Sequence, residues 1–343
     1  MERRTKNSGK VAIASMLAAC TLGASPMLAS GSTHSSSAHE TTSPRSLQSG
    51  STPSPSEPHK QRNPYTAINT AAARDPITVT PLRGGVYLLQ GSGGNIGVLP
   101  GKGGALMVDA GVTVSRHKLE DTLKKLRASR VRYLVDTHWH FDHTGGNGWV
   151  HEHGAEIIST PNTLDNLSKT IRVNEWSHTF TPLPAAARPT VTVSSEKTLT
   201  VNGQSVRLRT YSPGHTDGDL SADFTRANVL FTGDTFWNNL YPFIDYEVGG
   251  SIDGMIRDAN QNIAMVGGGT IVVPGHGPVG RRADLVEFRD MLVGIRARVA
   301  DLKHKGLTVD QVIAAKPTKS FDAKWGQGLI GPDLFTKLVY RGV

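Results

Sequence analysis

Cysteine is nearly absent from this chain of 343 residues, which contains Cys20 and no other. A single thiol excludes a disulfide-stapled scaffold, a Cys-ligated zinc ribbon, an iron–sulfur site and a Cys-x-x-Cys redox motif. Long hydrophobic runs are also lacking after the N-terminus, so the body of the chain is not a bundle of membrane-spanning helices. The length and the 37% of hydrophobic residues are enough for one large domain or two modest ones.

Positive charge is unevenly distributed along the sequence. The formal net charge is +8, but the first 64 residues hold 7 Lys and Arg against 3 Asp and Glu, whereas the remaining residues hold 30 against 26. The body is therefore only mildly basic, and no inserted nucleic-acid-binding segment is visible in it. We expect a small-molecule substrate and no nucleic acid partner.

The first 30 residues predict an export signal, because basic residues precede a short apolar run at positions 11–19 that cannot span a membrane. The run ends in Leu-Ala-Ala-Cys at residues 17–20, which resembles the lipobox of bacterial lipoproteins. If the lipobox is used, Cys20 is lipidated and attaches the mature chain to a membrane. The alternative is an ordinary signal cleaved after Ala29 or Ser30. Both interpretations predict an exported protein, either periplasmic or anchored as a lipoprotein.

Residues 31–70 are expected to form a disordered tether, and residues 71–343 a single folded domain. Of the 34 residues at positions 31–64, 19 are Ser, Thr or Pro, and Leu47 is the only large aliphatic residue among them. Such a segment cannot bury enough apolar surface to offset the entropy lost on ordering.

Beyond the tether, short β-rich runs alternate with amphipathic helices, as in an α/β domain. We expect strands at residues 77–79, 86–89, 96–99, 105–108 and 131–135, then at 191–193, 197–201, 205–211, 220–224, 229–231 and 270–273. We expect helices from a Ser115 cap to about residue 128, at 252–265 and 282–299, and short ones near Val309 and Pro332. Two strand-rich halves that each close with helices predict two mixed sheets packed face to face, with helices outside.

Four side chains able to bind metal follow the predicted strand at 131–135 within six residues: His138, His140, Asp142 and His143. Alternation in an extended segment would place His138, His140 and Asp142 on one side, and His143 on another side where it can bind a second ion. Imidazole and carboxylate groups at this density favour zinc over magnesium or calcium. The aromatic residues between them argue against a polar surface loop.

Three more candidate ligands each follow a predicted strand later in the chain: His215 in Pro-Gly-His, Asp234 in Thr-Gly-Asp, and His276 in Pro-Gly-His-Gly. The glycines beside them allow a close approach of the backbone. Three such strand ends, in this order after His-x-His-x-Asp-His, form a strong joint signal for one metal centre.

This set of motifs resembles the metallo-β-lactamase fold superfamily over about residues 76–290. The resemblance implies an αββα sandwich with two metal ions at one edge of the sheets. It implies that one zinc ion is held by His138, His140 and His215, that the other is held by Asp142, His143 and His276, and that Asp234 bridges them.

Three further aspartates are candidates for orienting the imidazole ligands. Asp109 matches a buried aspartate of the same family, although a turn-capping role for it is equally open. Asp217 and Asp219, which follow His215 closely, are the other two candidates, and the sequence does not assign any of them to a particular histidine.

The chemistry implied by the resemblance is hydrolysis, in which a hydroxide shared by two zinc ions attacks a carbonyl carbon. The substrate would be an ester, lactone, thioester or amide, β-lactams included, and Asp142 would carry a proton to the leaving atom. A bridging Asp234 resembles glyoxalase II and lactonases more than the true β-lactamases, which mostly carry Cys or Ser there. Trp237, Tyr241 and Phe243 are candidates for the mouth of the pocket, with core packing as the alternative.

The ligand positions also bear on three alternative functions. Flavin-linked di-iron oxidoreductases of this fold carry Glu where His140 stands, which argues against them. Persulfide dioxygenases share the His-x-His-x-Asp-His pattern with a single iron ion, and this alternative stays open. A non-catalytic exported binding protein would be expected to have lost ligands, yet all seven positions are filled. The sequence after Leu302 shows no chemistry, and it does not predict an oligomeric state.

Overall fold

The computed structural model describes residues 63–91 and 93–343. The predicted export signal, the lipobox at Cys20 and most of the predicted tether lie outside these residues. No helix within the described ranges is long and apolar enough to cross a membrane.

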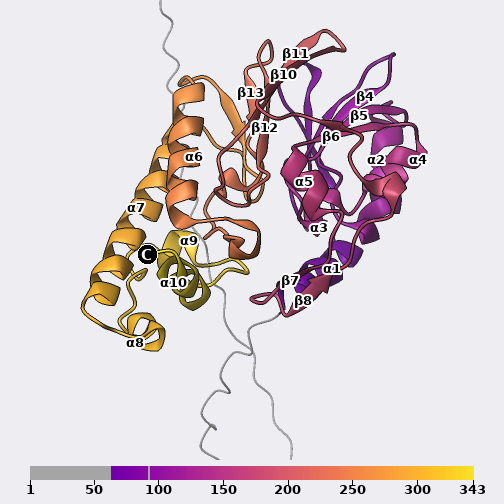
Figure 1. The fold of residues 1–343 in the computed structure, drawn as a ribbon. Helices are drawn as coiled ribbons and strands as arrows, with labels where there is room; N and C mark the ends of the chain where they lie inside the picture. Colours follow the sequence, from indigo (N-terminus) through magenta and orange to yellow (C-terminus); the bar gives the residue numbers. More distant parts are fainter. Residues whose placement is uncertain (1–62, 92) are drawn as a thin grey trace, which may run out of the picture. The chain divides into compact units, whose positions relative to one another are not determined.

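Two β-sheets form the centre of the domain (Figure 1), and a hairpin of β7 (Ile171–Val173) and β8 (His178–Phe180) lies apart from them. The seven-stranded sheet contains, in spatial order, β1 (Thr78–Pro81), β2 (Tyr87–Gln90), β3 (Ile96–Leu99), β4 (Ala105–Val108), β5 (Val131–Val135), β6 (Glu156–Ser159) and β9 (Val191–Thr192). The five-stranded sheet contains β10 (Glu196–Val201), β11 (Gln204–Thr210), β12 (Leu220–Phe224), β13 (Val229–Phe231) and β14 (Ile271–Val273). Both sheets are mixed, because β4, β5, β6 and β9 run parallel in the first sheet and β13 and β14 in the second, while the other neighbours are antiparallel.

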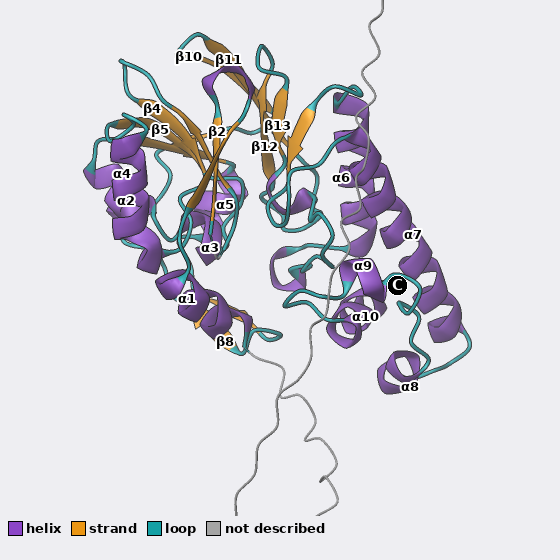
Figure 2. Ribbon diagram, turned by 180° about the vertical axis from the view of Figure 1, so that it is seen from behind, coloured by secondary structure: helices purple, strands orange, loops and turns teal. Residues whose placement is uncertain are grey.

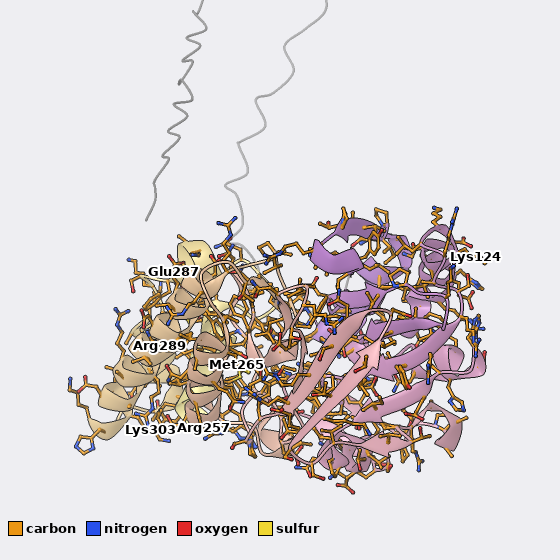
Figure 3. The ribbon with its side chains drawn as sticks, turned by 90° about the horizontal axis from the view of Figure 1, so that it is seen from above. Lys124, Arg257, Met265, Glu287, Arg289 and Lys303 are labelled. Atoms are coloured by element: carbon orange, nitrogen blue, oxygen red, sulfur yellow. The ribbon has the colours of Figure 1, made fainter. Side chains whose placement is uncertain are left out.

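Helices cover the outer faces of both sheets (Figures 1 and 2), with α2 (Arg116–Lys125) and α4 (Asn147–Glu152) on the first and α6 (Ile252–Met265) and α7 (Arg282–His304) on the second. Seen from above, Lys124 of α2 lies at one side of the domain and Arg289 of α7 at the other, with the strands between them (Figure 3). The remaining helices are α1 (Pro64–Arg74), α3 (Phe141–Thr144), α5 (Pro161–Asn166), α8 (Val309–Ala314), α9 (Asp322–Trp325) and α10 (Pro332–Arg341). The predicted αββα sandwich is confirmed.

The alternation of side chains along the strands explains the layering. In β4, Leu106 and Val108 pack between the two sheets, whereas Met107 packs against the helix layer that contains α2. In β13, Phe231 likewise faces the space between the sheets, and Leu230 faces α6 and α7. Successive residues of a strand point to opposite faces, so a buried strand that is apolar throughout serves two cores at once.

The structure differs from the expected N-terminal boundary of the domain. Helix α1 begins at Pro64, so its first residues lie in the segment that was expected to be tether up to residue 70. Asn63 caps the helix by accepting a hydrogen bond from the Thr66 amide (3.3 Å), and a proline at the first helical position already has a suitable φ. The composition of residues 31–64 obscured this local start signal.

The first helix of the sheet layers begins as predicted but lacks the expected cap. Ser115 is the residue before α2, yet its side chain makes no capping hydrogen bond, and the helix ends at Lys125 instead of about residue 128. Leu119 and Leu123 are buried against the first sheet. The burial of this face therefore positions α2 without help from the cap.

Candidate metal centre

All seven predicted ligands meet at one edge of the two sheets. Those at 138 and 140 follow β5, those at 142 and 143 lie in α3, and the remaining three follow β11, β13 and β14. The donor atoms form two groups, and within each group they lie within 4.8 Å of one another. The first group contains His138, His140, His215 and Asp234, and the second contains Asp142, His143 and His276.

The first group has the dimensions of a tetrahedral site. Nδ1 of His140 lies 3.0 Å from Nε2 of His138 and 3.0 Å from Nε2 of His215. Oδ2 of Asp234 lies 3.3 Å from Nε2 of His215. Four ligand atoms about 2.1 Å from one tetrahedral zinc ion would lie roughly 3.4 Å apart. The donor atoms and their spacing therefore fit a divalent ion.

The second group lies beside the same aspartate, with Nε2 of His276 3.4 Å from Oδ2 of Asp234. Nε2 of His276 lies 3.3 Å from Oδ2 of Asp142 and 3.3 Å from Nε2 of His143. Oδ1 of Asp234 is 3.2 Å from Nε2 of His143, and it is a buried atom with no hydrogen-bond partner. An unpartnered buried carboxylate oxygen is costly unless it binds a cation, so this position also fits a metal ligand.

The prediction that Asp142 shares a side with His138 and His140 is wrong. His140 is the last extended residue of the segment (φ −61°, ψ 146°), and α3 starts at Phe141. Within this helical turn Asp142 and His143 both lie near His276, and not in the group of His138. The period of the backbone changes between His140 and Asp142, so the alternation rule fails there.

Asp109 contacts a ligand directly. Its Oδ2 lies 2.8 Å from Nδ1 of His143, and its carboxylate also accepts hydrogen bonds from the amide (2.8 Å) and hydroxyl (2.9 Å) of Thr137. Asp109 has a positive φ of 62°, a conformation that aspartate tolerates better than most residues. The carboxylate therefore fixes the His143 ring with Nε2 toward the metal site, and it also secures the strand end before His138.

The other two aspartates proposed to orient ligands do not contact an imidazole. Asp219 accepts hydrogen bonds from the amide and hydroxyl of Thr216, and Asp217 accepts one from the Asn166 amide group. The sequence analysis missed Asp245, whose Oδ2 lies 3.0 Å from Nε2 of His140. Asp245 lies 105 residues after His140 in the sequence, so no local pattern linked the two.

Burial and charge set the protonation of the cluster. Burial lowers the pKa of His215 to about 4 and also moves the pKa of His138 well below its ordinary value. Burial alone would raise the pKa of Asp234, but the surrounding imidazoles, His276 and His143 first, lower it well below its ordinary value. His143 behaves differently, because the carboxylates of Asp234, Asp109 and Asp142 outweigh the effect of burial and raise its pKa well above the ordinary value. Imidazoles bind metal ions in the neutral form and carboxylates in the ionised form, so a metal ion at the second group would displace a proton from His143.

A cavity of about 20 Å³ borders both groups, since His140, Asp142, Asp234 and His276 are among its lining residues. This volume is enough for about one water molecule, and the lining supplies several polar partners. An attacking water would therefore have a defined place.

The three aromatic residues after Asp234 have different roles. The Trp237 ring lies 4.2 Å from the His276 ring between centroids and lines the cavity, and Phe243 also lines it. Tyr241 is buried and stacks on Phe335 at 4.6 Å, so it belongs to the core. The pocket-mouth interpretation therefore holds for Trp237, whereas Tyr241 fits the alternative of core packing.

Comparisons with known proteins agree with this geometry. The sequence profile of the Metallo-beta-lactamase superfamily matches residues 89–278. The human acyl-coenzyme A thioesterase MBLAC2 is 24% identical over 214 residues, which cover 57% of this chain and 73% of that protein.

Solved structures share the fold. The DIM-1 metallo-beta-lactamase aligns with a TM-score of 0.51 and 22% identity over 63% of this chain and 97% of its own. The sec-alkylsulfatase Pisa1 of Pseudomonas sp. aligns with a TM-score of 0.59 and 17% identity over 77% of this chain and 50% of its own. With the family profile covering more than half of the sequence and the His and Asp clusters in place, the chain belongs to the metallo-beta-lactamase superfamily and is a metallo-hydrolase.

Proposed function

We propose that the chain binds two zinc ions and hydrolyses an acyl compound: an ester, lactone, thioester or amide, with β-lactams included. The observation that carries the proposal is the pair of donor groups with the Asp234 carboxylate between them. The donors are imidazoles and carboxylates without thiolates, a set that zinc accepts readily. A mononuclear iron enzyme would leave the second group without a role.

When bound, a pair of divalent ions supplies an ionised water molecule and polarises the substrate carbonyl. The protein's own part is to place the reactants. Asp142 lines the small cavity with Oδ2 at 3.3 Å from Nε2 of His276, where its carboxylate can take up a proton and return it to the leaving atom. Trp237 and Phe243 exclude bulk water from the same space.

Among acyl substrates, a thioester or ester is the best first candidate. The human relative is an acyl-coenzyme A thioesterase by name, and it matches over most of its own length. A bridging Asp234 points in the same direction, away from the true β-lactamases. We further propose that the protein acts after export, in the periplasm or attached through Cys20.

The proposal is tested by metal analysis together with a substrate panel. Purified chain, loaded with zinc and desalted, is expected to contain two ions and to hydrolyse at least one of p-nitrophenyl acetate, an acyl thioester, a lactone and nitrocefin. His138→Ala is expected to abolish this turnover and to reduce the zinc content. A single iron ion with oxygen consumption would refute the hydrolase assignment, as would unchanged turnover in the variant.

A further inference from the structure

A large groove opens beside the metal centre and is not explained by metal binding. It has a volume of about 680 Å³, in the range of sites for small organic ligands. Its apolar lining includes Ala67, Ile68 and Ala71 of α1, which are half-buried. The polar lining residues within the same helix, Thr66, Thr70 and Arg74, are exposed, so the polar groups that α1 contributes lie at the rim of the groove.

One face of α1 forms a complete wall of this groove. The lining positions 63, 66, 67, 70, 71 and 74 follow helical spacing, and from first to last they extend about 16 Å at the rise of an α-helix. Ile68 lines both the groove and the small metal cavity, whereas Ala71 and Arg74 line the groove alone. The groove therefore leads from the metal centre along α1 toward Arg74.

The opposite wall is also apolar and connects to the metal centre. It is formed by Trp237, Leu240 and Leu329, the last in the segment between α9 and α10. Leu329 is 43% exposed, unusually open for a leucine of this domain. Trp237, Leu329 and His276 line the groove and the metal cavity alike, so a bound molecule can reach both.

Contacts on the other faces of α1 hold the helix in place, so this wall of the groove is formed without a bound ligand. Tyr65 stacks on His178 of β8 at 3.7 Å and lies 4.7 Å from the ring of Phe141, the residue between two predicted ligands. The Lys118 amine donates to the Ala72 carbonyl at the end of the helix. Figure 2 shows α1 beside β8, at the same end of the domain as α9 and α10.

We propose that this groove binds the apolar acyl chain of an ester or thioester whose carbonyl lies at the metal centre; the inference rests on the proposed hydrolase function. In the reaction, the oxygen of water forms a bond to the acyl carbon and the bond to the leaving oxygen or sulfur breaks. One proton of the water passes to that leaving atom and the other is released to solvent, so a fatty carboxylate and an alcohol or thiol are formed. The acyl chain lies along α1 from Ile68 toward Arg74.

The test varies acyl length while the leaving group stays the same. With zinc-loaded full chain, kcat/KM is expected to rise from p-nitrophenyl acetate through butyrate and octanoate to laurate, by up to about fourfold for each methylene buried. Ala67→Trp and Ala71→Trp place a bulky ring in the groove one helical turn, about 6 Å, apart. The preference for longer chains is expected to end at a shorter chain in Ala67→Trp than in Ala71→Trp.

Ala73→Trp is the matched control, since Ala73 is exposed on the same helix and does not line the groove. It is expected to follow the wild-type length dependence. If acetate is hydrolysed but acyl length has no effect on kcat/KM, or if only larger leaving groups raise kcat/KM, the groove does not bind the acyl chain. The proposed hydrolase function would still stand. If no ester or thioester is hydrolysed, the proposed function itself fails.

A binding measurement keeps the acyl groove testable without turnover. Calorimetry of laurate with the zinc-loaded chain is expected to detect binding by the wild type and by Ala73→Trp, and binding at least about tenfold weaker by Ala67→Trp, with circular dichroism confirming that each variant is folded. Equal affinity in all three proteins, or no binding by any of them, would contradict the proposal.

Discussion

Each of the three histidines in the first donor group contacts a different kind of group through the ring nitrogen that faces away from the metal site. Nδ1 of His215 contacts the Phe243 carbonyl (2.9 Å), Nδ1 of His138 lies 3.1 Å from the Thr137 hydroxyl, and Nε2 of His140 contacts Asp245. Each contact fixes the ring with its other nitrogen toward the metal site. The partner also sets the tautomer, and a carboxylate increases the basicity of the ligand most.

Asp245→Asn is expected to lower the zinc affinity of the first donor group by about tenfold or more, because the charge that orients His140 is lost. The measurement is competition with a coloured chelator. Asp217→Asn is the matched control. Asp217 lies close to the candidate ligand His215 in the sequence, but its carboxylate contacts Asn166 instead of an imidazole. Equal affinities in the two variants would show that Asp245 has no orienting role.

Local patterns mark the candidate ligands but not the groups that contact them. His-x-His-x-Asp-His and the Pro-Gly-His segments are dense in unusual residues, so the sequence singled out all seven side chains that the fold brings together. Asp245 approaches His140 only because the chain after β13 folds back over the site, with the Asp245 amide donating to the His215 carbonyl (2.9 Å). Such a contact depends on tertiary structure, which no periodicity encodes.

The same distinction applies to helices and strands. Most strands and helix α6 were predicted to within two residues, whereas α7 begins at the predicted Arg282 but continues to His304, beyond the predicted end at residue 299. Among the helices that were not predicted, the short helix α3 interrupts the ligand motif, and α1 follows directly on a polar segment that hides its start. Four-residue helices bury too few side chains to leave a pattern.

Helix α6 packs directly on the loop that carries His215. Asp258 of α6 is fully buried, and neither of its carboxylate oxygens has a hydrogen-bond partner. A Cβ atom at Gly214 would overlap one of these oxygens, so the loop approaches this closely only because residue 214 is glycine. Burial first, and then the nearby Asp219, raise the pKa of Asp258 from the ordinary 3.8 to about 8.

The raised pKa makes the fold less stable as the pH rises. Between the two values the folded protein keeps a proton on Asp258 that the unfolded chain has lost, so the free energy of unfolding falls by up to about 1.4 kcal/mol per pH unit. Asp258→Asn, which stays neutral, is expected to reduce this slope. Asp219, whose pKa burial raises to about 7, contributes in the same direction and remains in the variant.

Urea unfolding of both proteins across this pH interval, with zinc held saturating, measures the slope. Identical pH dependence in wild type and Asp258→Asn would show that the carboxyl is not protonated in the fold. Stabilisation of the variant should be greatest at the alkaline end of the interval, where the wild type must either ionise Asp258 in the interior or unfold.

Metal ions are expected to contribute to the stability of the whole domain. An ion that binds only the folded state adds about 2.7 kcal/mol to the free energy of unfolding when its free concentration is a hundredfold above the dissociation constant. Removing zinc with a chelator should therefore lower the thermal midpoint, and re-addition should restore it. In His276→Ala, which lacks one donor of the second group, the chelator should cause a smaller shift. A midpoint that does not respond to the chelator in wild type would contradict metal binding at this site.

The donors come from both sheets: His138 and His140 follow β5 of one, while Asp234 and His276 follow the parallel pair β13 and β14 of the other. An ion bound there would be a cross-link between two layers that are otherwise joined by apolar packing and by hydrogen bonds such as those from the Leu220 amide to the Thr137 carbonyl and from the Asn95 amide to the Gly275 carbonyl (2.8 Å each). The layers can separate only after the ligands release the ion, so loss of metal would expose the interior to proteases from this edge first. Catalytic competence and resistance to degradation would then depend on the same few atoms.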